Sequence, residues 1–116
     1  MTFGKHLVLD LKNCNHKKMI TTSSMRQFVI DLCFLIDMNR FEETLIRRLG
    51  NGKLEGYSLF QFIETSNITI HFEEIKNQVF IDLFSCKDFN ENSVINFSKN
   101  YFEGEILESR VFKRGL

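Results

Sequence analysis

Three residues of this chain have side chains that together could carry covalent chemistry. Ser66 supplies a hydroxyl nucleophile, His71 supplies an imidazole five positions later, and Cys86 supplies a thiol. A free imidazole is largely neutral at pH 7 and can remove a proton, whereas a free thiol still holds its proton and can donate it. These residue types and spacings are what a chain needs to cut itself and convert the serine into a carbonyl cofactor.

Each of the three residues also has an ordinary structural explanation. A serine commonly begins a strand, a histidine commonly lies on an exposed sheet face, and a cysteine commonly behaves as a small buried hydrophobe. Their joint spacing favours the chemical interpretation. The chain's histidines and cysteines show no paired ligand spacing, so the sequence predicts no metal site.

Length and composition predict one domain spanning residues 1–116. Hydrophobic residues make up 43% of the chain and include 13 phenylalanines, which indicates an aromatic-rich core. The 15 basic and 15 acidic residues balance, so no global field attracts nucleic acid or an acidic membrane surface. We therefore expect neither nucleic acid nor membrane as a partner.

The cysteines and the amino terminus point to a location. The three cysteines form no CxxC pair, and an odd number argues against a closed disulfide framework. The amino terminus lacks a charged-then-apolar signal pattern, and no stretch approaches about 18 apolar residues. The expected location is the cytoplasm.

Hydrophobic periodicity predicts six strands and two helices. The strands are expected at about residues 6–11, 41–49, 55–63, 67–73, 79–84 and 105–112, and the helices at about 24–38 and from 88 or 90 to 104. Their order favours an α+β fold, a two-layer α/β sandwich with one mostly antiparallel sheet and both helices on one face.

Helix boundaries follow from capping signals. Ser24 and Gln27 resemble a capping box for the first helix, and Asp88 or Asn90 is expected to cap the second. The weakly basic segment 12–18 is expected to be a solvated loop. A stripe at helical spacing is predicted to bury one face of the first helix against the sheet: Met25, Phe28, Val29, Leu32, Leu35 and Ile36.

Strand geometry constrains the proposed chemistry. In a regular strand beginning at residue 66, Ser66 and His71 would point to opposite faces, because side chains alternate with a period of two. We therefore expect Ser66 to lie in a bend before the strand. A strained peptide at that bend would also favour attack on the preceding carbonyl.

Several segments together resemble the prokaryotic S-adenosylmethionine decarboxylase proenzymes. The resemblance covers nearly the whole chain in order, and its most specific part is the spacing of Ser66, His71 and Cys86, which fits that family without an insertion. The other matching segments are 6–10, 14–15, 56–58, 82–86 and 114–115.

The resemblance implies a self-processing, pyruvoyl-dependent decarboxylase. Ser66 would attack the carbonyl of Thr65, the ester would eliminate, and residue 66 would become a pyruvoyl group that forms a Schiff base with a substrate amine. His71 would be the base in processing, Ser58 would assist it, and Cys86 would return a proton during turnover. S-adenosylmethionine would be the substrate, in the synthesis of polyamines such as spermidine, and the enzyme would be a homodimer without metal.

The chain departs from the family pattern at defined positions. Thr65 replaces the usual glutamate before the serine, Gly52 replaces an adenine-stacking aromatic, and the segment 72–75 replaces one that carries a tryptophan and a glutamate. Phe72 or another phenylalanine is a candidate replacement for the lost aromatics. Two alternatives stay open: a pyruvoyl-dependent decarboxylase of another amino acid, such as ornithine or arginine, and a non-cleaving, non-enzymatic homologue.

Overall fold

The computed structural model describes residues 2–116 as one six-stranded sheet with helices packed on it. The strands lie in the order β2-β3-β4-β5-β1-β6, and every neighbouring pair is antiparallel. The elements along the chain are β1 (Gly4–Lys12), α1 (His16–Ile20), α2 (Thr22–Leu35), β2 (Arg40–Leu49), a 3-10 turn (Gly52–Leu54), β3 (Gly56–Ile63), β4 (Ser66–Glu73), β5 (Gln78–Ser85), α3 (Glu91–Phe102) and β6 (Glu105–Arg114).

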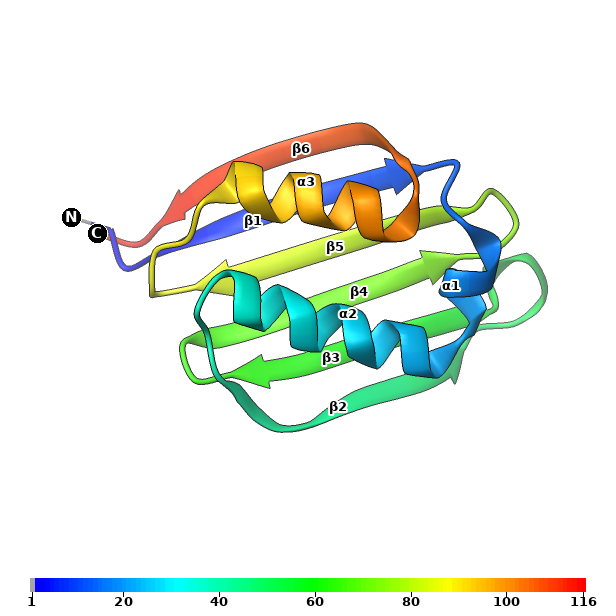
Figure 1. Ribbon diagram of the computed structural model, residues 1–116, viewed down its shortest axis with the longest axis horizontal. Helices are drawn as coiled ribbons and strands as arrows, with labels where there is room; N and C mark the ends of the chain where they lie inside the picture. Colours follow the sequence, from blue (N-terminus) through cyan, green and yellow to red (C-terminus); the bar gives the residue numbers. More distant parts are fainter. Residues whose placement is uncertain (1) are drawn as a thin grey trace.

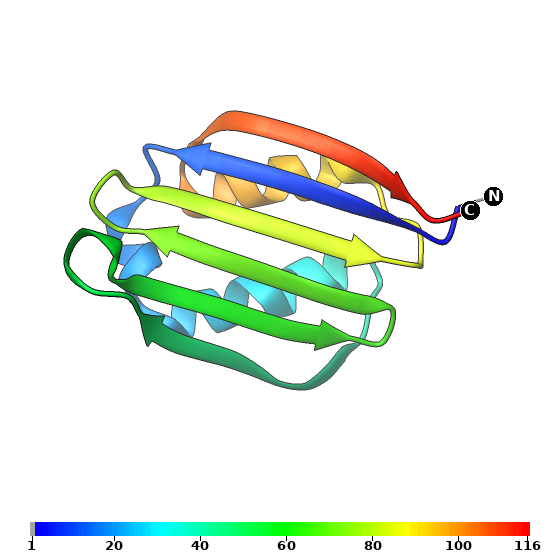
Figure 2. The ribbon, with the colours of Figure 1, turned by 180° about the vertical axis from the view of Figure 1, so that it is seen from behind.

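The molecule has two layers, and the helices cover only one side of the sheet. Helix α3 lies over β1 and β5, and α2 lies over β3 and β4 (Figure 1). Seen from behind, the six strands are uncovered (Figure 2). We call this uncovered side the open face. The α+β sandwich with both long helices on one face is therefore confirmed.

Alternation along the central strands builds the core. Along β4, Ile68, Ile70 and Phe72 are buried towards the helices, whereas His71 on the other side is exposed. The same alternation buries every second residue of β1 and β5. Because three adjacent strands present apolar rows to one side, the helices must pack there to remove this surface from water.

The layer between helices and sheet is aromatic, as the 13 phenylalanines suggest. The ring of Phe28 on α2 lies 4.8 Å from that of Phe102 and 5.6 Å from that of Phe97, both on α3. Phe102 in turn meets Phe72 of β4 at 5.9 Å. These contacts join both long helices to the middle of the sheet.

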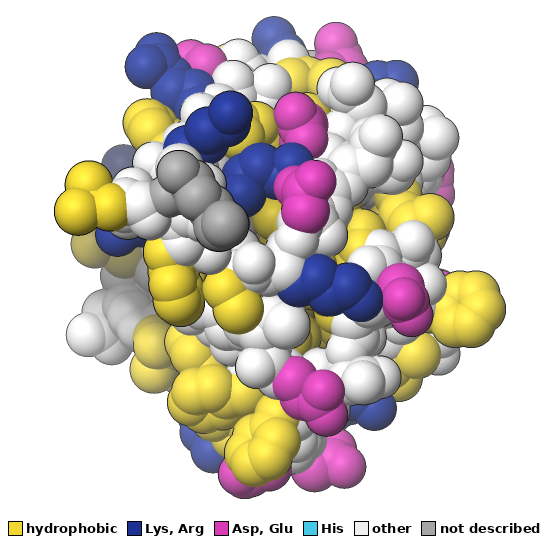
Figure 3. Space-filling model, turned by 90° about the vertical axis from the view of Figure 1, so that its left-hand side faces the viewer, with side chains coloured by type: hydrophobic (Ala, Val, Ile, Leu, Met, Phe, Trp, Pro, Cys, Tyr) yellow, Lys and Arg dark blue, Asp and Glu magenta, His cyan; other side chains and the backbone are white. Residues whose placement is uncertain are grey.

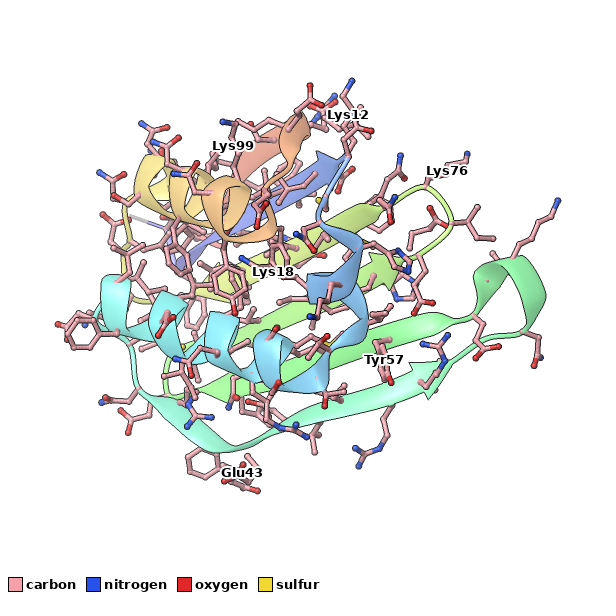
Figure 4. The ribbon with its side chains drawn as sticks, turned by 45° about the vertical axis from the view of Figure 1, so that its right-hand side comes forward. Lys12, Lys18, Glu43, Tyr57, Lys76 and Lys99 are labelled. Atoms are coloured by element: carbon pink, nitrogen blue, oxygen red, sulfur yellow. The ribbon has the colours of Figure 1, made fainter. Side chains whose placement is uncertain are left out.

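The first helical region differs from the prediction at its start. The basic segment expected to be a loop contains α1, which begins after Asn15, whose side chain accepts a hydrogen bond from the Lys18 amide. Met19 is buried in the core. The Lys18 side chain extends from α1 towards α3, where its amine donates to the Tyr101 carbonyl at 2.7 Å (Figure 4). Tertiary packing of one apolar residue thus orders a segment whose composition is polar.

The capping box at Ser24 is wrong, because α2 already begins at Thr22. The Ser24 amide donates to the Thr21 carbonyl, and the Gln27 side chain bonds Asp31 instead of a helix end. At the other end the helix stops at Leu35, which is 46% exposed and not part of the buried stripe; Cys33 is buried instead.

A Schellman-type turn explains why α2 ends before Met38. Asp37 has a left-handed backbone (φ 54°), and the Met38 amide donates to the Cys33 carbonyl at 2.9 Å. Glycine usually occupies this left-handed position, so the aspartate hid the signal. Of the two caps expected for α3, Asp88 and Asn90, the structure has Asn90, whose side chain accepts a hydrogen bond from the Ser93 amide.

Within residues 2–116, no helix is both long and apolar enough to span a bilayer.

Candidate functional site

The peptide bond between Thr65 and Ser66 lies where β3 turns into β4. Glu64 and Thr65 form the two-residue turn, and Ser66 is already the first residue of β4, paired with Ile63 and Ser85. Its backbone is extended (φ 159°). The expected bend at Ser66 is therefore wrong: the turn falls one residue earlier, because the β3–β4 hairpin closes with only two residues.

The Thr65 carbonyl, which Ser66 would attack, is held by a backbone donor. The amide of Cys86 donates to the Thr65 carbonyl oxygen at 3.0 Å. The Ser66 hydroxyl accepts from the Asn67 side chain at 3.2 Å, and Ser66 is half-buried whereas Cys86 is exposed. The fold thus brings Ser66 and Cys86 together, as the sequence spacing suggested, because β4 and β5 are paired neighbours.

A buried serine beside this peptide was missed in the sequence. Ser85 is fully buried; its hydroxyl donates to the Thr65 hydroxyl at 2.8 Å and accepts from the Lys87 amide at 3.0 Å. A signal was present, since Ser85 is the one polar member of the alternating buried row that includes Ile81 and Leu83.

A cavity of about 490 Å³ opens at the same end of the molecule. It is lined by Cys86, Lys5, Asp88 and Glu91, among others. Figure 3 looks onto this end and shows basic and acidic side chains side by side, with hydrophobic groups around them. Lys5 bonds both carboxylates at 2.8 Å, which lowers the pKa of Asp88 and Glu91.

Ser58 and His71 form a second group on the open face. They are directly opposite each other in the β3–β4 pair, and the Ser58 hydroxyl lies 2.7 Å from His71 Nδ1. Arg47, next to Ser58 on β2, lines the same shallow pocket of about 420 Å³. The structure therefore joins the two residues that the family resemblance links to processing.

The two groups are separated within one chain. His71 lies five residues after Ser66 along an extended strand, which corresponds to about 16 Å. His71 is therefore too far away to remove a proton at residue 66 of its own chain. Hydrogen-bond contact is needed for that step.

Phe72 cannot replace a lost stacking aromatic, because it is fully buried beneath the helices. The other replaced positions serve the hairpins. Glu74 accepts two hydrogen bonds from the Arg48 guanidinium, at 2.7 and 3.0 Å, and Arg48 also stacks over Tyr57. Glu73 accepts from backbone amides of its own turn.

In the part of the chain that the structure describes, no three His, Cys, Asp or Glu side chains gather as a metal site would require. The three cysteines also differ in environment. Burial raises the pKa of Cys14 and of Cys33 to about 11, which keeps both thiols protonated, whereas Cys86 faces solvent. Only Cys86 combines accessibility with a place beside Ser66.

Comparison with known proteins gives a consistent result over the whole chain. A family model described as S-adenosylmethionine decarboxylase matches residues 5–115. Two relatives from Clostridium botulinum, strains Loch Maree / Type A3 and Langeland / NCTC 10281 / Type F, are called S-adenosylmethionine decarboxylase proenzyme. Each is 26% identical over 113 residues, which cover 97% of this chain and 94% of the relative.

Among solved structures, the fold is similar to the crystal structure of the adenosylmethionine decarboxylase from Aquifex aeolicus VF5. The TM-score is 0.83 at 16% identity, and the match covers 99% of this chain and 92% of that one. At this identity the likeness concerns the fold.

Proposed function

Because the chain belongs to the S-adenosylmethionine decarboxylase family, we propose that it is a self-processing, pyruvoyl-dependent carboxy-lyase acting on S-adenosylmethionine for spermidine synthesis. One observation carries the self-processing part. The Thr65–Ser66 peptide lies at a hairpin end with its carbonyl already bonded to the Cys86 amide. That donor points at the oxygen on which negative charge would develop during attack.

Processing begins with an acyl shift. The Ser66 oxygen bonds to the Thr65 carbonyl carbon, the bond from that carbon to the Ser66 nitrogen breaks, and the hydroxyl proton passes to that nitrogen. Loss of the Ser66 α-proton then expels the Thr65 carboxylate, and addition of water with loss of ammonia leaves a ketone on residue 66. Ser66 has a position that fits this change, since it is half-buried at a strand end with a solvent-exposed thiol beside it.

During turnover, the pyruvoyl group would supply a carbonyl that condenses with the substrate amine and draws electrons from the bond to the leaving carboxylate. Cys86 would hold a proton for return to the product at the end of the reaction. Its backbone amide and its thiol thus have separate tasks, one in processing and one in turnover.

Removal of the Ser66 α-proton needs a base, and we assign that role to His71. Because His71 lies about 16 Å from Ser66 along β4, this base must come from a second copy of the chain. We infer a homodimer in which each chain offers its Ser58–His71 pair to Ser66 of the other. In each pair the Ser58 hydroxyl orients the imidazole at 2.7 Å.

The open face supports such a dimer. It carries partly exposed apolar side chains on several strands, which a second sheet would remove from water. The exposed ones among them are Leu45 and Leu49 of β2, Phe62 of β3 and Phe112 of β6. A twofold axis across this face would pair the two sheets, and sharing of the base requires that this pairing bring each Ser58–His71 pair to the partner's Ser66 end.

Intact-mass analysis of the purified protein tests the proposal. We expect two chains, residues 1–65 and 66–116, with the second beginning in a pyruvoyl group, and one uncut 13.7 kDa chain in Ser66→Ala. The processed protein should release carbon dioxide from carboxyl-labelled S-adenosylmethionine in preference to ornithine or arginine. A wild-type chain that stays whole would instead support a non-enzymatic homologue.

A further inference from the structure

We propose that Ser85 is a positioning residue that aligns the Thr65 carbonyl for the acyl shift. The inference rests on the proposed function, because it concerns the self-processing step. Ser85 is the last residue of β5 and lies between two strands, paired with Ser66 on one side and with Lys5 of β1 on the other. It is fully buried, in a row that is otherwise apolar.

A buried hydroxyl costs free energy unless it is hydrogen-bonded, and the Ser85 hydroxyl makes two hydrogen bonds, one to Thr65 and one to the segment that carries Cys86. It accepts from the Lys87 amide at 3.0 Å, which curls the chain after β5, and it donates to the Thr65 hydroxyl at 2.8 Å. The Thr65 hydroxyl in turn donates a hydrogen bond to the Met38 sulfur at 3.6 Å.

The Cys86 amide lies within this arrangement. Cys86 stands between Ser85 and Lys87, and its amide donates to the carbonyl of the residue whose hydroxyl Ser85 holds. One serine therefore fixes both the donor segment and the acceptor residue. Close approach of β1 contributes as well, because a Cβ on Gly4 would lie 2.7 Å from the Ser85 carbonyl oxygen.

The consequence concerns the first step of processing. As the Ser66 oxygen bonds to the Thr65 carbon and the amide bond breaks, charge grows on the Thr65 oxygen. The Cys86 amide stabilises that charge only if the oxygen stays in place. The hydrogen bond between the Ser85 and Thr65 hydroxyls thus aligns Thr65, the residue that precedes Ser66.

Pulse-labelled cell-free synthesis of the full chain measures the cleavage rate directly. We expect Ser85→Ala to cleave roughly 10-fold more slowly or worse than wild type, and Ser85→Thr, which keeps the hydroxyl, to recover most of the rate. Thr65→Val should slow cleavage similarly, and the double variant should be little slower than either single one, because both remove the same bond. Ser98→Ala is the matched control, since Ser98 is equally buried but its hydroxyl has no partner within the described residues.

Hydroxylamine, which cleaves esters, separates a defect in the acyl shift from a defect in the elimination that follows it. It should speed cleavage of His71→Ala, in which the ester forms but does not eliminate, and should leave Ser85→Ala slow because the ester itself forms slowly. If Ser85→Ala cleaves as fast as wild type, or if hydroxylamine rescues Ser85→Ala, the role of Ser85 is overturned and the proposed function stands. A wild type that never cleaves would overturn the proposed function and this inference together.

Discussion

At the scale of residues, Cys86 illustrates how one position can contribute twice. Its amide bonds the Thr65 carbonyl at 3.0 Å, and its thiol faces solvent beside Ser66. A side-chain substitution removes only the thiol. The proposed processing and the proposed turnover can therefore be separated at this residue.

We expect Cys86→Ala to be cleaved at nearly the wild-type rate and to lose about 100-fold or more in carbon dioxide release, because an unassisted proton return is slow. Mass analysis and labelled-substrate assays on one preparation measure both. Cys33→Ala, which removes a buried thiol on α2, should keep both activities. Equal turnover in Cys86→Ala and wild type would exclude the thiol as the donor.

At the scale of elements, Arg48 ties the edge of the sheet to the β4–β5 turn. It lies on β2, bonds Glu55 before β3, and holds Glu74 through two hydrogen bonds. Hydrogen bonds from Arg48 lower the pKa of Glu74 below its ordinary value. The β4–β5 turn is thereby fixed to β2, which lies two strands away from β4 in the sheet.

A carboxylate whose pKa is lowered on folding stabilises the protein above its unfolded pKa, and this stability is lost as the pH falls through the folded pKa. Glu74→Gln should therefore reduce the free energy of unfolding by about 1 kcal/mol at pH 7, and the two proteins should converge at strongly acidic pH. Urea titrations at one protein concentration measure this. Glu43→Gln is the control, because Glu43 projects from the outer edge of β2 (Figure 4) and should change little.

At the scale of the whole molecule, the separation of Ser66 from His71 makes the proposed active site a property of two chains. Each chain has both halves, on one sheet, at positions that cannot meet. A chain that lacks His71 can then be processed by the His71 of a partner chain that retains it.

Co-expression of differently tagged Ser66→Ala and His71→Ala chains tests this sharing. Each variant alone should remain uncut, whereas in the mixed dimer the His71→Ala chain should be cleaved by the partner's His71. Tandem purification followed by mass analysis gives the result. Mixed dimers that stay whole, or His71→Ala that cleaves alone, would rule out sharing of the base between chains.

Much of the fold could be predicted because local patterns and tertiary packing agree. The alternation along β4 and the helical stripe around Phe28 each identify an element and its buried side. The exceptions are places where a distant contact decides: α1 is ordered by burial of Met19, and α2 ends at a left-handed Asp37 instead of a glycine.

The sequence by itself determined which side chains are present for chemistry, and through the spacing of Ser66, His71 and Cys86 it indicated the family. Only the tertiary structure decided which of them meet. Strand pairing places Cys86 beside Thr65 and Ser58 beside His71, and it keeps the two pairs apart. The reason is that contact across a sheet depends on register between strands, which neither strand encodes alone.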